Sequence, residues 1–104
     1  MSSRIDSLRS LLAQDPGNSR FRYMLAMETL NSGDLEAAAA VFDEILDRDP
    51  DYTAAYFHGG QTLEKLGRVE AAKAMYRRGI EAATRTGDAH TRSELQGALD
   101  LLGG

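Results

Sequence analysis

Residues able to carry acid–base, nucleophilic or metal chemistry are few in this sequence. The chain of 104 residues contains two histidines, His58 and His90, and no cysteine. No Ser-His-Asp pattern accompanies the histidines, and the absence of cysteine excludes a disulfide framework or a thiolate metal site. A single histidine on a helix more often packs or faces solvent than binds a metal. We therefore predict no catalytic residue, no metal site and no cofactor, and we expect that the protein is not an enzyme.

A run of alternating aspartates resembles the start of a calcium-binding loop. Its members are Asp47, Asp49 and Asp51. A calcium loop of this kind needs glycine at its sixth position and a bidentate glutamate at its twelfth. This sequence has Tyr52 and His58 there. Pro50 explains the segment more simply, because the residue before a proline is pushed out of helical geometry. The aspartates are therefore expected to form a solvated turn between two helices.

The charge balance is acidic, with 16 aspartates and glutamates against 12 lysines and arginines and a net charge of −4. An acidic surface repels phosphate backbones, so we do not expect nucleic acid as a partner. No stretch approaches the roughly 20 apolar residues that span a bilayer. The first residues also lack the apolar core of a signal peptide. These features predict a cytoplasmic protein without a membrane partner.

The sequence repeats itself after 34 residues. The shift aligns glycine with glycine, proline with proline, and one aromatic residue with another. The aligned pairs are Gly33 and Gly67, Pro16 and Pro50, Ala38 and Ala72, and Phe42 and Tyr76. A fixed period of this length indicates a repeat architecture, in which each unit packs against its neighbours.

Each unit predicts two helices joined by a glycine turn. Gly33 follows a run of apolar residues at helical spacing and can adopt the left-handed geometry of a helix end. Asp34 then stands where an N-cap is needed, whereas Arg68 at the equivalent position predicts a weaker helix start. We expect an all-α chain with an N-terminal helix over 3–14, repeats over 18–50 and 51–84, and a final helix over 88–102. In the first helix, the residues expected to face inward are Ile5, Leu8, Leu11 and Leu12.

The period, the two-helix unit, the central glycine and the terminal proline resemble the tetratricopeptide repeat family over about residues 5–84. The resemblance implies one domain over 1–104 that forms an α-solenoid, a right-handed superhelix of two full repeats. An N-terminal half-repeat helix and a C-terminal capping helix are expected to close the array. Arg22 departs from the family's preferred tryptophan. Gly59 and Gly79 stand where bulkier residues or alanine are usual, so we expect loose packing in the second unit.

In this family the first helix of each unit lines a concave groove that holds a segment of a partner protein. The resemblance therefore implies a protein-binding adaptor or scaffold. Carried over by position, the groove is lined by Tyr23, Met27, Leu30, Asn31, Phe57, His58, Gln61 and Lys65. This mixture suits an apolar or amphipathic peptide. A second interpretation is that Tyr23 and Phe57 only wedge between helices and complete the core.

One subset of the family grips the terminal carboxylate of its partner with lysine, asparagine and arginine. At the repeat spacing, the corresponding positions are Tyr23, Met27, His58, Asp88 and Arg92. Only Arg92 fits, so an apolar segment is the better prediction. The register of the last helix stays open, because Thr84 replaces the terminal proline. The alternative function is a self-associating structural module, a homodimer formed through the groove or the end helix.

Overall fold

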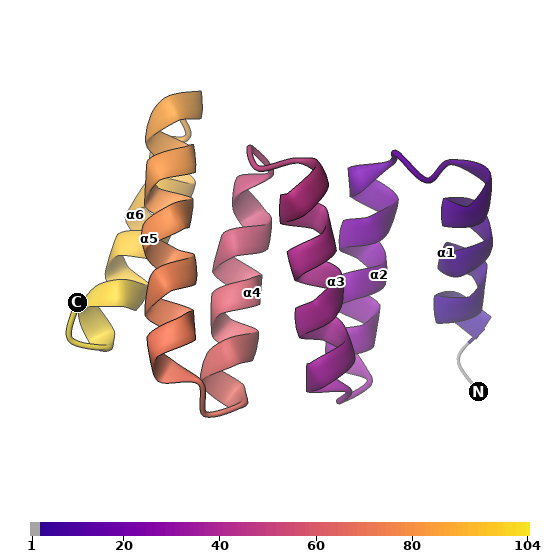
Figure 1. Cartoon of the computed structure of the whole chain (residues 1–104), viewed down its shortest axis with the longest axis horizontal. Coiled ribbons are helices and arrows are strands. Elements are labelled where there is room, and N and C mark those ends of the chain that lie inside the picture. Colours follow the sequence, from indigo (N-terminus) through magenta and orange to yellow (C-terminus); the bar gives the residue numbers. More distant parts are fainter. Residues whose placement is uncertain (1–2) are drawn as a thin grey trace.

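The computed structural model describes residues 3–104. Residues 1 and 2, which belong to the predicted domain and to the segment compared with a signal peptide, lie outside it. The described part contains six α-helices and no strand: α1 (Ser3–Gln14), α2 (Ser19–Asn31), α3 (Leu35–Arg48), α4 (Thr53–Lys65), α5 (Val69–Thr86) and α6 (Ala89–Leu101). The helices stand in a row with α1 and α6 at opposite ends (Figure 1). Each packs against the next along the chain, and α4 also contacts α6. The predicted all-α solenoid is confirmed.

The helix ends follow the chemistry of the predicted turns. Gly33 and Gly67 have φ values of 91° and 78°, in the left-handed region. The Asp34 side chain accepts a hydrogen bond of 3.1 Å from the backbone N–H of Ala37 and caps α3. Arg68 makes no such bond at the start of α5, so the expected difference between the two helix starts is confirmed.

The core lies along the seam between successive helices and contains the residues that the repeat aligns. Ala38, Phe42, Ala72 and Tyr76 are all fully inaccessible to solvent. The small residues let neighbouring helices approach closely, and the aromatic residues fill the space between units. The predicted register of the two repeats is therefore confirmed.

The first helix is less covered than the sequence predicted. Leu8 is buried, but Leu11 is 41% exposed, whereas its equivalent one unit later, Ile45, is fully buried. The reason is the place of α1 at the end of the row, where none of the helices within residues 3–104 covers its outer side (Figure 1). The expectation that Leu11 faces inward is wrong for this reason.

The second unit is tightly packed at its glycines, contrary to the expectation of loose packing. A Cβ atom added to Gly79 would lie 2.6 Å from Cβ of Tyr56 and 2.8 Å from Cδ1 of Leu95. One added to Gly59 would lie 3.3 Å from Cβ of Phe42. These glycines therefore do not leave gaps, because neighbouring helices occupy the space that a side chain would take.

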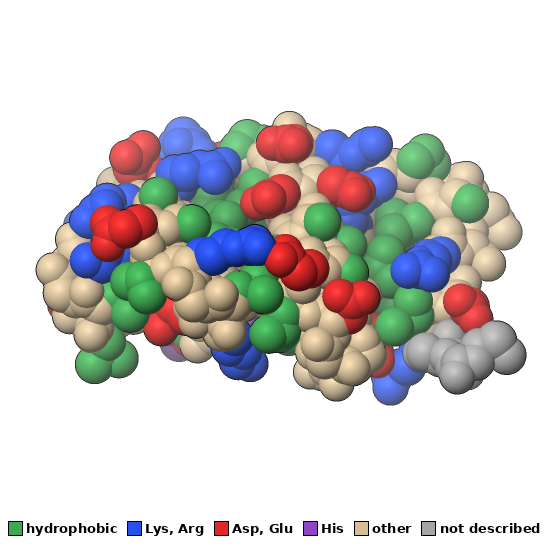
Figure 2. All heavy atoms as spheres, turned by 60° about the horizontal axis from the view of Figure 1, so that its bottom comes forward, with side chains coloured by type: hydrophobic (Ala, Val, Ile, Leu, Met, Phe, Trp, Pro, Cys, Tyr) green, Lys and Arg blue, Asp and Glu red, His purple; other side chains and the backbone are tan. Residues whose placement is uncertain are grey.

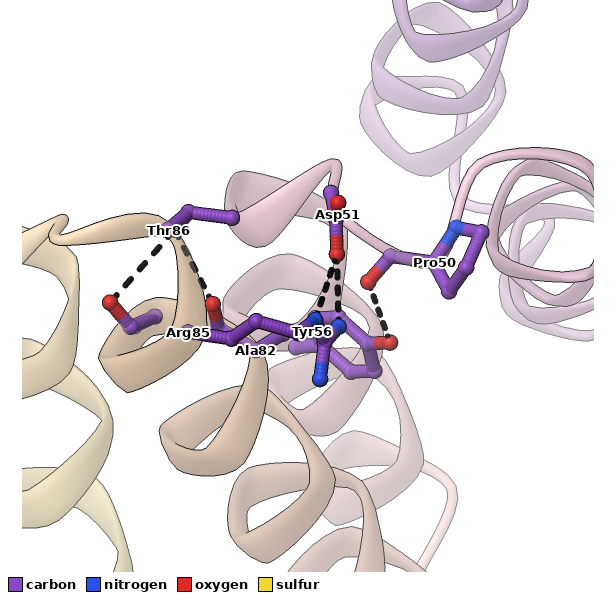
Figure 3. Close-up of polar contacts among 7 residues, drawn as sticks. Pro50, Asp51, Tyr56, Ala82, Arg85 and Thr86 are labelled. Carbon is purple, nitrogen blue, oxygen red and sulfur yellow. Dashed lines mark hydrogen bonds and ion pairs between the residues drawn. The ribbon is translucent and has the colours of Figure 1, made fainter.

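A polar network fixes the turn between α3 and α4 to the end of α5 (Figure 3). The Tyr56 hydroxyl donates a hydrogen bond of 2.7 Å to the carbonyl of Pro50. The Arg85 guanidinium reaches across to Oδ1 of Asp51 with bonds of 3.0 and 2.6 Å. At the first residue of α4, the Thr53 hydroxyl donates a 2.6 Å hydrogen bond to Asp88, the N-cap residue of α6. These contacts hold α4 in place relative to α5 and α6.

Candidate functional site

The first helices of the units, α2 and α4, bring an aromatic cluster together. The Tyr23 ring lies 5.9 Å from the His58 ring, 5.2 Å from Tyr52 and 6.3 Å from Phe42, between ring centroids. The Phe57 ring lies 5.4 Å from that of His58. Tyr23 and Phe57 are half-buried and pack against the core. Both side chains therefore support the core and keep part of their surface open to solvent.

One depression lies between α1 and α2 and has a volume of about 290 Å³. It contains two of the predicted groove residues, Tyr23 and Met27, together with Leu8 from α1. An ion pair of 3.2 Å between Arg4 and Glu28 stands at this depression. The contribution of α1 was not predicted, because the family positions were carried over only from the first helices of the two full units.

A second depression, of about 520 Å³, lies between α4 and α6. It is lined by Phe57, Gln61, Ser93, Glu94, Gly97, Ala98 and Leu101. Phe57 and Gln61 were predicted, and the residues of α6 were not. Leu101 is 90% exposed and presents its side chain almost wholly to solvent.

The residues of α6 were missed because this helix starts two residues late. α4 begins 34 residues after α2 (Thr53 against Ser19), whereas α6 begins 36 residues after α4 (Ala89 against Thr53). The position that the repeat spacing assigned to Arg92 therefore belongs to Glu94. Arg92 lines a separate depression of about 260 Å³, formed by residues of α6. The single residue that matched the carboxylate clamp is thus replaced by an acidic one.

Glu94 gives this surface its electrostatic character. Burial lowers the pKa of His58, the nearby Glu94 carboxylate opposes that shift, and Lys65 adds to it. Burial also raises the pKa of the Tyr23 hydroxyl, and the charges of Tyr52 and Glu94 raise it further. Both aromatic side chains therefore lie within the field of the Glu94 carboxylate. We call the surface formed by Tyr23, Met27, Phe57, His58, Gln61 and Glu94 the groove face.

Four of the predicted residues lie outside the two depressions: His58, Leu30, Asn31 and Lys65. Leu30 is half-buried against the core, and Asn31 is exposed at the end of α2. Lys65 is exposed and lines a separate depression of about 270 Å³ with Gln61 and Glu64. Across the face seen in Figure 2, acidic, basic and apolar side chains are interspersed, without a basic patch.

Among residues 3–104, no group of three or more histidines, aspartates or glutamates is arranged to hold a metal ion. None of the helices over the same range combines the length and the hydropathy needed to cross a bilayer.

Comparison with known proteins identifies relatives across most of the chain. A family model described as tetratricopeptide repeat matches residues 29–99. A TPR repeat-containing protein of Pseudomonas aeruginosa is 28% identical over 91 residues, which cover 88% of this chain and 87% of that protein.

Two solved structures are similar in both sequence and fold. The crystal structure of a tetratricopeptide repeat domain protein from Salinibacter ruber has 38% identity and a TM-score of 0.79, covering 84% of this chain and 97% of that one. The solution structure of a protein from Bordetella parapertussis has 30% identity and a TM-score of 0.84, covering 99% and 90%.

Proposed function

Since the chain belongs to the tetratricopeptide repeat family, whose fold is a protein-interaction scaffold, we propose that its groove face holds a segment of a partner protein. The observation that carries this proposal is that equivalent residues of α2 and α4 line the two depressions. Tyr23 and Met27 in the first stand one repeat, 34 residues, before Phe57 and Gln61 in the second. A segment lying across α2, α4 and α6 would meet apolar surface at both places.

The proposed role is that of an adaptor in the cytoplasm, without catalysis or a cofactor of its own. Its proposed ligand is a peptide segment rather than nucleic acid or lipid. Within the single domain proposed for residues 1–104, the repeats over 18–50 and 51–84 carry the groove face, and the helix over 88–102 both caps the array and contributes to binding.

The test compares a change on the groove face with a change elsewhere. Tyr23→Ala combined with Phe57→Ala removes two aromatic anchors, each of which typically contributes ~2 kcal/mol or more to binding. We expect affinity capture of a partner from native cell extract to be lost. Asp43→Lys, at an exposed position of α3, should leave capture intact. Because Tyr23 also contacts the core, circular dichroism and thermal melting must show that the double variant is folded. Equal capture by both variants would contradict the proposal.

A specific observation favours a second candidate, self-association into a homodimer. Leu101 is 90% exposed at the end of α6 beside the second depression, and a second copy would cover it. Sedimentation over a range of concentrations would detect the dimer. Leu101→Glu should then yield a monomer, whereas a monomeric wild-type protein would remove this candidate.

A further inference from the structure

We propose that the groove face selects a partner segment in which a lysine or arginine stands beside a large apolar residue. The inference rests on the proposed function and specifies the chemistry of the segment. The basic group would lie beside the Glu94 carboxylate, which lines the same depression as the Phe57 ring. The apolar side chain would occupy the depression between α4 and α6.

The basic group is specified by an acidic side chain that lacks a permanent counter-ion. The only ion pair of Glu94 within residues 3–104 is a 3.7 Å contact with His90, which is charged only when that histidine is protonated. The His90 side chain is 86% exposed, so it can turn away without loss of packing. A cation beside Glu94 would also meet aromatic surface, which attracts positive charge.

Other charges nearby do not cancel that of Glu94. Arg4 is paired with Glu28 at 3.2 Å beside the first depression. Lys65 lies seven residues after His58 on α4, about 10 Å along a helix, and lines a different depression from Glu94. The net charge of −4 adds a long-range attraction for positively charged segments.

The preference for a large apolar side chain in the partner segment is inferred from the residues that line the second depression. Phe57 and Ala98 are half-buried and pack against the core, and Leu101 stands exposed at the rim. Gly97 faces open space, because a Cβ atom added there would meet nothing within 4 Å. A large side chain from a partner can therefore enter beside Gly97 without displacing any atom of the groove face.

The experiment uses two synthetic probes and fluorescence anisotropy. One probe is a short amphipathic peptide built from leucine, alanine and lysine, and the other has glutamate at each lysine position. The full chain should bind the lysine peptide more tightly. Glu94→Gln should weaken binding of the lysine peptide about fivefold, as expected for one partly exposed ion pair. Glu81→Gln, which removes the same charge from an exposed position of α5, should leave affinity unchanged.

A second variant tests whether the groove face binds peptides at all, independently of any preference for a basic residue. Gly97→Phe fills the depression from within and should weaken both peptides at least tenfold, while the open space around Gly97 preserves the fold. If Gly97→Phe weakens both peptides but the wild-type protein binds them equally, the groove face binds segments and the charge preference is wrong. If Gly97→Phe changes nothing, the groove face itself is not the binding surface.

The remaining outcomes also overturn the proposal. These are preference for the glutamate peptide, an equal effect of Glu94→Gln and Glu81→Gln, and no binding of either peptide. A wild-type dimer that dissociates on Gly97→Phe would identify a second copy of this chain as the occupant instead.

Discussion

Two glycines in successive helices provide the sharpest test of the packing described above. Gly79 lies on α5, where an added Cβ would meet Cβ of Tyr56 at 2.6 Å and Cδ1 of Leu95 at 2.8 Å. Gly97 lies on α6, where an added Cβ would meet nothing within 4 Å. The same substitution, glycine to alanine, should therefore have opposite effects on the free energy of unfolding at the two sites.

The magnitudes follow from two competing effects. In a helix, alanine is favoured over glycine by about 0.5–1 kcal/mol, because an alanine has less backbone freedom in the unfolded chain and so loses less on folding. Gly97→Ala should stabilise the protein by that amount. At Gly79 the extra methyl group must displace two side chains, of which Tyr56 is 3% exposed and Leu95 fully buried. Overpacking of this kind costs about 1–3 kcal/mol, so Gly79→Ala should destabilise the protein by about 1–2 kcal/mol.

Thermal and urea unfolding followed by circular dichroism measure both values. In a domain of this size, each 1 kcal/mol shifts the melting temperature by about 4–8 °C, so the two variants should melt on opposite sides of the wild-type protein. A stabilising effect of Gly79→Ala would mean that α4, α5 and α6 do not meet at this glycine. A destabilising effect of Gly97→Ala would mean that the depression is filled in the free protein.

Three further predictions concern stability. Arg22 is 6% exposed and its Nη1 has no hydrogen-bond partner among the described residues. Arg22→Met should therefore stabilise the protein by about 1–3 kcal/mol. A large decrease of the unfolding free energy in urea would show instead that the 3.5 Å ion pair between Arg22 and Glu44 stabilises the fold. Phe42 is fully buried, so Phe42→Ala should cost about 3–5 kcal/mol, and an unchanged melting temperature would refute the assignment of α3. Burial lowers the pKa of His58 from its ordinary 6.5, so the unfolded state binds more protons below that pH and stability should fall on acidification. His58→Gln should reduce that loss in a pH series, and an identical series would contradict this assignment.

The fold could be predicted because the residues that end its helices act locally. A glycine with positive φ at Gly33, and a proline after the end of α3, fix where helices stop regardless of what surrounds them. Ala38 is fully buried, and its small side chain lets neighbouring helices approach closely. Glycine and proline at these positions therefore predict the helix ends from a few neighbouring residues.

Tertiary surroundings decided what the sequence did not predict. A glycine in a helix can mean either empty space or a neighbour in close contact, and Gly79 and Gly97 differ only through residues that lie far away in the chain. Arg22 departs from the residue that the family prefers at this position of a groove helix, yet it is buried and pairs with Glu44. In both cases the residue type alone does not indicate which neighbours surround it in the fold.

The chemistry of the groove face depends on the length of α5. In the first unit a proline follows α3, whereas Thr84 at the equivalent position allows α5 to continue to Thr86, until Gly87 ends it with a φ of 74°. α5 has 18 residues against 14 in α3, and two residues rather than four connect it to the next helix, so α6 begins two residues later than the repeat spacing. A shift of two positions along a helix is about 200° around its axis, which exchanges the residues that face a given neighbour. The loss of one proline therefore places Glu94 beside Phe57 and turns Arg92 away from it, so the sign of charge offered to a partner is set by where a helix ends.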